Sequence, residues 1–365
     1  MKIKTQDLKE HFARILLKWD KEKNIRQMPW KGEKDPYRIW LSEIILQQTR
    51  VEQGLGYYSR FLHAFPNVHQ LAGATDERIF KLWEGLGYYS RCRNLIASAR
   101  FIVKNLDGKF PSSYETIKEL KGVGPYTASA ISSFAYNLPH AVVDGNVNRV
   151  LARIFGISLP VNSVAGKKAF NMLANELMKT EEAGKYNQAI MDFGAVVCKP
   201  VAPACKTCVF RKNCYAFIND QVDQLPVKDK KPPVKKRWFY YVFIEKMIEA
   251  GQYRFAIRQR RESDIWKDLF EFPLVEVKIE MEASIVLKKA EKNMGLRKKQ
   301  YSLISVSPLF RQQLSHQLIA GRFIRIRLKQ DEELENDWQW VSKEQLNELA
   351  FPRYINQFLS NTAVN

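Results

Sequence analysis

The sequence predicts a nearly all-α domain followed by a smaller α+β domain. From about Leu8 to Val197, apolar residues recur at three- and four-residue spacing, which is the period of amphipathic helices. The segment Gln224–Lys236, rich in proline and lysine, interrupts this pattern and is typical of a linker. Aromatic and β-branched runs beyond it indicate strands. The predicted parts of the 365-residue chain are a helical domain at 1–215, a basic linker at 216–237 and a second domain at 238–365.

Turn residues mark where helices of the first part begin. Asp35 followed by Pro36 is the usual pair of a helix N-cap and first helical residue. Farther along, Gly122–Pro125 breaks the chain before another helix. No stretch of this part alternates apolar and polar residues as a half-buried strand would. Helical spacing is clearest at Ile39, Trp40, Ile44 and Ile45, and again at Val147, Val150, Leu151 and Ile154.

The second part is expected to combine strands and helices. Strands are predicted at Arg237–Ile244, Tyr253–Ile257 and Arg322–Leu328, where aromatic and β-branched residues dominate. Helical spacing marks Ala283–Asn293 and Lys343–Leu349.

The net charge indicates a polyanionic partner. The chain has 58 Lys and Arg against 39 Asp and Glu, a net charge of +19. Such an excess is typical of nucleic-acid binding. Residues 1–215 carry 32 basic and 19 acidic side chains, and Lys228–Arg237 adds six basic and one acidic. The rest of the second domain is nearly neutral, so the charge belongs to the first part and the linker.

Membrane and export segments are not expected. No run approaches the roughly 18 consecutive apolar residues that span a bilayer, and residues 1–7 contain no apolar signal core. We therefore expect a soluble, cytoplasmic protein without membrane contact. With the charge, we expect it to be DNA-associated, and we expect a monomer.

Four of the five cysteines fall within seventeen residues, at Cys198, Cys205, Cys208 and Cys214. Four thiolates at this spacing suit either a tetrahedral zinc ion or a cubane iron–sulfur cluster. Zinc sites usually pair two Cys-x2–4-Cys knuckles, and only one is present here. Four free cysteines are the third interpretation. Cys92 stands alone in a helical pattern and is expected in the core.

A tight turn at Gly122 and Gly124 separates two helical patterns. Backbone N–H groups at such a turn, and the N-terminus of the helix after it, can hold a DNA phosphate. Twenty residues after Gly124, Asp144 follows an apolar run and precedes another helical pattern. Its simplest role is to cap that helix.

Together these motifs resemble the endonuclease III superfamily of DNA glycosylases, and within it the MutY adenine DNA glycosylases. The glycine hairpin, the following aspartate and the cysteine loop occur in the order typical of the superfamily. The MutY resemblance, over about residues 7–215, is carried by Met28–Trp30, Trp40–Thr49, Leu82–Arg91 and Met191–Ala195. It implies an all-α helix-hairpin-helix glycosylase domain with an iron–sulfur loop and a [4Fe–4S] cluster. It also implies base excision repair of duplex DNA in which adenine is mispaired with 8-oxoguanine or guanine.

Two carboxylates are candidates for the chemistry, by analogy with glycoside hydrolysis. Glu43 lies among apolar residues, which favour a protonated acid, whereas Asp144 at a helix start is expected to stay ionised. The resemblance assigns the roles in the same way. Glu43 would protonate the base, Asp144 would stabilise or attack the sugar, and Asn146 and Tyr126 would support them.

Position 126 distinguishes hydrolysis from strand cleavage. Superfamily members that cleave the strand carry in this hairpin a lysine that forms a Schiff base with the sugar. Tyr126 stands here instead, so we expect a monofunctional hydrolase. The first alternative is a bifunctional endonuclease III-type glycosylase and AP lyase. The second is a non-catalytic DNA-binding iron–sulfur protein, which would need neither Glu43 nor Asp144.

The resemblance also implies which residues contact DNA. The adenine must leave the base stack before its glycosidic bond can be reached. Tyr88 would wedge beside the partner base and Gln48 would enter the duplex. The other implied contacts are Thr49 and Leu86 to the partner base, Gly122 and Gly124 to a phosphate, and Arg26, Trp30 and Gln188 around the adenine.

The second domain resembles the α+β MutT/Nudix-like domain of the same family, in Ile265–Pro273 and Leu314–His316. It lacks the Arg-Glu-x-x-Glu-Glu metal box of active Nudix hydrolases, so we expect no pyrophosphohydrolase activity. The resemblance makes Ser315 and His316 the candidate readers of 8-oxoguanine. The family motif usually begins with Phe, where this chain has Leu314.

Overall fold

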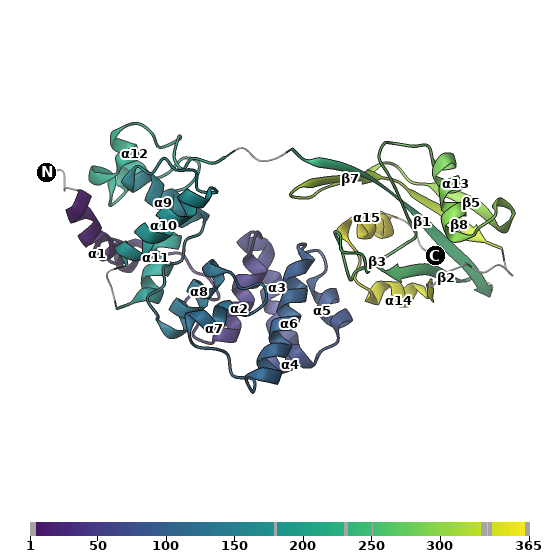
Figure 1. The fold of residues 1–365 in the computed structure, drawn as a ribbon, viewed down its shortest axis with the longest axis horizontal. Coiled ribbons are helices and arrows are strands. Elements are labelled where there is room, and N and C mark those ends of the chain that lie inside the picture. Colours follow the sequence, from purple (N-terminus) through teal and green to yellow (C-terminus); the bar gives the residue numbers. More distant parts are fainter. Residues whose placement is uncertain are drawn as a thin grey trace. The chain divides into compact units, whose positions relative to one another are not determined.

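The computed structural model of the protein describes residues 5–178, 181–229, 233–249, 251–329, 334 and 338–361. The chain divides into two compact units (Figure 1). The first comprises residues 1–73 and 93–230, and the second comprises residues 74–92 and 231–365. Each unit has a hydrophobic core of its own.

The first unit is built from helices, and its described residues contain no strand. None of the described helices of the chain has the length and hydropathy of a membrane-spanning segment. Helix α6 (Tyr89–Asn105) runs from the second unit into the first. The other helices of the first unit are α1 (Thr5–Lys23), α2 (Pro36–Leu46), α3 (Val51–Ala64), α4 (Val68–Gly73), α7 (Tyr114–Lys118), α8 (Pro125–Tyr136), α9 (Gly145–Phe155), α10 (Val164–Leu177), α11 (Ala183–Val196) and α12 (Tyr215–Ile218), with 3₁₀ turns η1 (Cys205–Thr207) and η2 (Arg211–Asn213).

Side-chain caps fix the start of two helices. Asp35 caps α2 by accepting a hydrogen bond from the Tyr37 N–H at 2.9 Å, with Pro36 in the first helical position. Asp144 caps α9 in the same way, accepting from the Val147 N–H at 2.7 Å. The local sequence therefore sets where both helices begin.

Aromatic packing ties the cysteine loop to the helices of the first unit. The Phe12 and Phe210 rings stack with centroids 4.9 Å apart. Phe193 meets Trp19 edge-on at 4.9 Å and Phe210 at 5.4 Å. Buried aromatic pairs of this kind stabilise beyond the area they bury. Phe210 lies between Cys208 and Cys214, so this packing fixes the loop against α1 and α11.

The two hairpin glycines differ in their surroundings. Gly122 has φ of +79°, a conformation that favours glycine, and a Cβ there would lie 2.7 Å from the Asn94 Cβ. Gly124 is the N-cap of α8 and has open space around it. The Ser98 hydroxyl donates to the Lys121 carbonyl at 3.0 Å and holds the turn from outside. The backbone therefore requires a glycine at 122 and tolerates a side chain at 124.

The second unit is an α+β domain around a mixed sheet (Figure 1). β1 pairs antiparallel with β2 and β4, and parallel with β7 and β8. β3 and β9 pair with β2, β5 with β8, and β6 with β7. The strands are β1 (Lys235–Glu249), β2 (Gln252–Gln259), β3 (Phe270–Glu271), β4 (Leu274–Val277), β5 (Tyr301–Val306), β6 (Phe310–Gln313), β7 (Gln317–Gly321), β8 (Phe323–Leu328) and β9 (Gln339–Val341).

Helices accompany the sheet. Apolar residues of α13 (Ala283–Met294) share a core with Tyr240 and Val242 of β1. Phe323 of β8 stacks on Phe358 of α15 (Arg353–Asn361) at 4.1 Å. The unit also contains α5 (Asp76–Trp83), α14 (Lys343–Glu348) and the 3₁₀ turn η3 (Lys298–Gln300).

The structure departs from the predicted linker at both ends. Leu225 is buried, and its carbonyl accepts from the Arg153 Nε at 3.0 Å. At the other end, Lys235 and Lys236 already belong to β1 and pair with β7. Composition marks this segment as a linker, but backbone pairing and one buried leucine order both of its ends.

The segment 74–92, predicted to belong with the helical domain, clusters with the second unit.

Candidate active site

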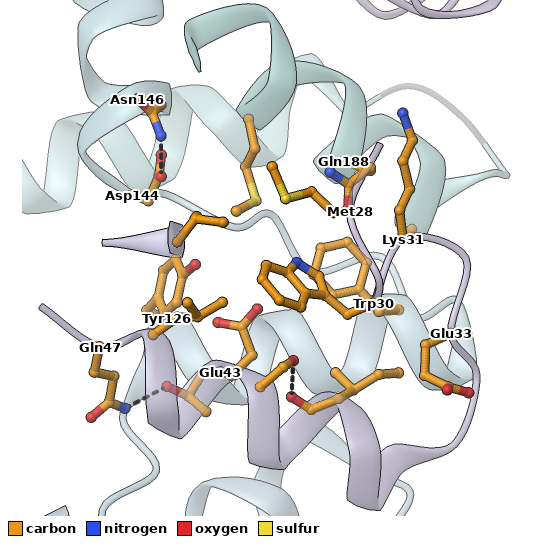
Figure 2. A pocket seen from close by; sticks show the side chains of 18 of the residues that line it. Met28, Trp30, Lys31, Glu33, Glu43, Gln47, Tyr126, Asp144, Asn146 and Gln188 are labelled. Atoms are coloured by element: carbon orange, nitrogen blue, oxygen red, sulfur yellow. Dashed lines mark hydrogen bonds between the residues drawn. The ribbon is translucent and has the colours of Figure 1, made fainter. Parts of the chain in front are cut away.

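Glu43 lines a cavity of about 890 Å³ in the first unit. Its side chain extends from α2, and the residue is only 8% exposed. Figure 2 shows the carboxyl group between Tyr126 and Trp30. Asp144 and Gln188 line the same cavity. The fold thus gathers residues from α2, α8, α11 and the start of α9.

Burial changes the acidity of Glu43. Loss of hydration raises the pKa of its carboxyl group to about 7. A hydrogen bond with Tyr126 opposes this rise, and the nearby Asp144 adds to it. A substantial fraction of Glu43 therefore carries a proton at neutral pH, as a general acid requires.

Tyr126 is the second residue of α8 and directly follows Pro125. Burial raises the pKa of its hydroxyl well above the usual value, and the nearby Glu43 acts in the same direction. The hydroxyl therefore remains a neutral hydrogen-bond donor. Gln47, the C-cap residue of α2, donates to the Thr127 hydroxyl at 3.1 Å and links the ends of the two helices.

Asp144 is held by two hydrogen bonds at the start of α9. Its carboxylate oxygens accept from the Val147 N–H at 2.7 Å and the Asn146 amide at 2.8 Å. Burial raises the pKa of Asp144 above its ordinary value, and these two bonds offset only part of that rise. The sequence suggested that a helix start alone keeps this group ionised. In the structure burial opposes ionisation, and the donors of Asn146 and Val147 favour it.

Two arginines connect α9 to the cysteine loop. Arg149 donates to the Asn146 side-chain oxygen at 2.8 Å and to the Cys198 carbonyl at 2.7 Å. Arg153 donates to the Lys199 carbonyl at 2.7 Å. The sequence pattern assigns these arginines no role. Both lie away from the apolar stripe of α9, where the helical pattern predicts exposed side chains. Their burial, at 8% and 3% exposed, follows from the packing of the cysteine loop, and a buried guanidinium needs partners.

The four cysteines share one neighbourhood. Burial raises the pKa of the Cys208 thiol to about 12, and the thiols of Cys198, Cys214 and Cys205 act in the same direction. Arg153 donates to the Cys198 Sγ at 3.5 Å, and the Cys214 thiol donates to the Arg153 carbonyl at 3.3 Å. Among the described residues, no group of three or more His, Cys, Asp or Glu side chains is arranged to hold a metal ion.

Asp192 organises the other end of the cavity. It is fully buried, and one of its oxygens accepts from Arg26 at 2.7 Å and Gln188 at 3.0 Å. The second oxygen accepts from Lys31 at 3.0 Å and Asn24 at 2.8 Å. Asp192 is part of the Met191–Ala195 motif, but the sequence pattern assigns no role to it or to Lys31. The signal was an acid inside the apolar run of α11, which must be paired when buried.

The remaining predicted DNA contacts fall in both units. Gln48 and Thr49 line the cavity of the first unit, together with Arg26, Trp30, Gly122 and Gly124. In the second unit, Leu86 is buried and Tyr88 is 41% exposed. The Tyr88 hydroxyl hydrogen-bonds the hydroxyl of Ser315, and both Ser315 and His316 are exposed. Gln48 and Tyr88 both adopt left-handed backbone conformations, with φ of +56° and +49°.

Comparisons with known proteins agree with this architecture. Residues 41–165 match the model for HhH-GPD superfamily base excision DNA repair proteins, and residues 246–361 match the NUDIX domain model. The adenine DNA glycosylase of Buchnera aphidicola subsp. Acyrthosiphon pisum is 32% identical over 360 residues, 97% of this chain and 98% of that protein. This chain belongs to the adenine DNA glycosylase family. The human adenine DNA glycosylase is 39% identical over 59% of this chain and 41% of its own.

Solved structures place the first unit in the same superfamily. A thermostable thymine-DNA glycosylase is 29% identical and superimposes with a TM-score of 0.55, over 59% of this chain and 99% of its own. The predicted class is confirmed: a helical helix-hairpin-helix glycosylase domain followed by a Nudix-like domain. The protein is thus a base excision repair glycosylase, a hydrolase that acts on DNA.

Proposed function

We propose that the protein hydrolyses the N-glycosidic bond of adenine placed opposite 8-oxoguanine, or opposite guanine, in duplex DNA. The observation that carries the proposal is the pair of unlike carboxyl groups, Glu43 and Asp144, in one cavity. The names of the relatives support adenine as the excised base.

Glu43 is the proton donor. When the bond between the sugar C1′ and the adenine nitrogen breaks, its electron pair goes to the base, which must be neutralised. A carboxyl group with a pKa of about 7 carries the required proton at neutral pH. The Tyr126 hydroxyl lies close to this carboxyl group and limits the rise of its pKa.

Asp144 stabilises the positive charge that develops on the sugar. Its carboxylate is oriented by the Val147 N–H and the Asn146 amide. Water then adds to C1′ and releases a proton, which completes the hydrolysis. The hairpin carries Tyr126 where the strand-cleaving enzymes carry lysine, so we propose no lyase step through a Schiff base.

Selectivity comes from the partner base. Tyr88 and Gln48 would enter the base stack, and their left-handed backbone conformations project them from turns after helices. Strain of this kind tends to be retained at functional sites. Ser315 lies beside Tyr88, and with His316 it would read the 8-oxoguanine.

The cysteine loop would hold a [4Fe–4S] cluster. Four soft thiolates within seventeen residues suit this cluster. When bound, the cluster would cross-link the loop. Arg149 and Asn146 connect the loop to Asp144, so an ordered loop would also support the active site.

Single-turnover excision assays on three duplexes test the proposal. The duplexes contain adenine opposite 8-oxoguanine, adenine opposite guanine, and thymine glycol opposite adenine. We expect excision from the first two and none from the third. Excision of thymine glycol with strand cleavage would favour the bifunctional alternative. DNA binding without excision of any base would favour the non-catalytic one.

A further inference from the structure

Helix α5 ends against the backbone of the C-terminal domain. This helix lies early in the chain, yet segment 74–92 clusters with residues 231–365 in one compact unit. Two side chains from the last turn of α5 make the contact, Lys81 and Glu84.

The contact is a closed ring of hydrogen bonds, which we call the clasp. The Lys81 Nζ donates to the Leu349 carbonyl at 2.9 Å, and the Phe351 N–H donates to one Glu84 oxygen at 2.8 Å. Lys81 and the other Glu84 oxygen form an ion pair at 2.9 Å. The two side chains are 35% and 19% exposed, so water screens the clasp only in part.

The segment that receives the clasp is anchored in the C-terminal core. The Ala350 carbonyl accepts from the Phe270 N–H of β3 at 2.9 Å. Phe351 is 1% exposed, and its ring stacks on Phe272 with centroids 5.6 Å apart. The clasp therefore joins α5 to a fixed part of the domain and not to a surface loop.

Only three residues, Gly85, Leu86 and Gly87, separate the clasp from Tyr88. Glu84 is the C-cap residue of α5. The intervening turn is held internally, because the Trp83 Nε1 donates to the Gly87 carbonyl at 2.9 Å and Arg91 lies over the rings of Trp83 and Tyr88. A turn this short and constrained transmits the position of its first residue to its last. The Tyr88 hydroxyl then meets Ser315 of the C-terminal domain.

We propose that Lys81 and Glu84 are positioning residues that hold Tyr88 in register with Ser315, so that the wedge is placed by the C-terminal domain. The inference rests on the proposed function for its effect on selectivity, but not for its effect on the turn itself. Loss of the clasp should weaken partner-base discrimination while leaving the chemistry at Glu43 intact. Charge-assisted hydrogen bonds of this kind suggest a fall of about tenfold in the preference for adenine opposite 8-oxoguanine over adenine opposite guanine.

The test uses the full chain with Glu84→Ala, Lys81→Met and both together. Glu84→Gln is the conservative variant, because its amide oxygen can still accept from the Phe351 N–H. The matched control is Lys18→Met with Glu22→Ala, an exposed ion pair within α1. Hydrogen exchange of the peptides covering 85–91 and 345–353, and single-turnover excision from both duplexes, are measured for each.

We expect Glu84→Ala to accelerate exchange in both peptides and to lower the preference ratio, while excision of adenine opposite guanine changes less than twofold. Glu84→Gln should fall between Glu84→Ala and the wild type, and the α1 control should match the wild type. Unchanged exchange in 85–91 would overturn the proposal. Equal losses on both duplexes would also overturn it, since they would show a role in general folding. If the wild type excised nothing, the exchange measurement would still decide the clasp and only the proposed function would fail.

Discussion

Glu43 is an acid whose protonation is set by its surroundings. It is 8% exposed on a helix that buries Trp40, Ile44 and Ile45 along with it. Desolvation raises its pKa to about 7, more than a hydrogen bond to Tyr126 can offset. The sequence predicts the apolar neighbours, and burial of the carboxyl group at the cavity wall turns them into a shifted pKa.

Replacing Glu43 by Gln removes the proton and keeps the shape of the side chain. We expect excision of adenine opposite 8-oxoguanine to fall at least about 100-fold, the usual contribution of a general acid. Duplex affinity, measured by fluorescence anisotropy, should change by no more than a few-fold. Excision near the wild-type rate would dismiss Glu43 as the acid.

The raised pKa of Glu43 also predicts how stability depends on pH. The folded protein keeps this proton up to about pH 7, while the unfolded chain loses it near the ordinary value of 4.5. The contribution of Glu43 to the free energy of unfolding therefore falls between these pH values, by up to about 3 kcal/mol.

Glu43→Gln should remove this dependence. Its free energy of unfolding relative to the wild type should rise from pH 4.5 to pH 7.5, measured by urea denaturation. The exposed Glu22→Gln variant serves as the control and should follow the wild type at both pH values. Parallel curves for Glu43→Gln and the wild type would contradict the raised pKa.

At the scale of elements, the surroundings of each glycine decide which side chains the hairpin can accept. Gly122 adopts φ of +79° against Asn94, whereas Gly124 begins α8 with open space around it. We expect Gly122→Ala to lower the free energy of unfolding by about 1–3 kcal/mol, from left-handed strain and the close contact. Gly124→Ala, the matched control, should change it by less than about 0.5 kcal/mol. Equal losses, measured by urea denaturation, would refute this account of the turn.

The cysteine loop predicts an iron-containing protein. Purified anaerobically, the protein should be yellow-brown, with about four iron atoms per chain by elemental analysis. Cys198→Ser should lower iron content, while Cys92→Ser in the buried core of α6 should not. Stoichiometric zinc without iron would overturn the cluster.

At the scale of the whole molecule, the residues proposed for catalysis and some of those proposed for partner recognition belong to different units of the chain. The cavity with Glu43 and Asp144 lies in the first unit, whereas Tyr88 and Ser315 lie in the second. Adenine is a normal base, so selectivity must come from the base opposite. The nearly neutral C-terminal domain is suited to hydrogen bonding with that base and not to general phosphate affinity.

Replacing both Ser315 and His316 by Ala should therefore lower the preference for adenine opposite 8-oxoguanine. We expect a loss of roughly 1–3 kcal/mol, the scale of one base-edge contact pair, with excision of adenine opposite guanine much less affected. Single-turnover rates on the two duplexes measure it. Equal losses on both would assign this loop to folding or general DNA binding.

Sequence patterns alone predict the helical first part, the strands and helices of the second, the caps at Asp35 and Asp144, and the cysteine loop. Each depends on residues close together in the chain, where hydrophobic periodicity, turn residues and cysteine spacing can be recognised. Only the tertiary structure decided the pKa of Glu43, the burial of Asp192 among four donors, and the attachment of α5 to the C-terminal domain. These depend on contacts between residues up to 268 positions apart, such as Lys81 and Leu349, which no local pattern records.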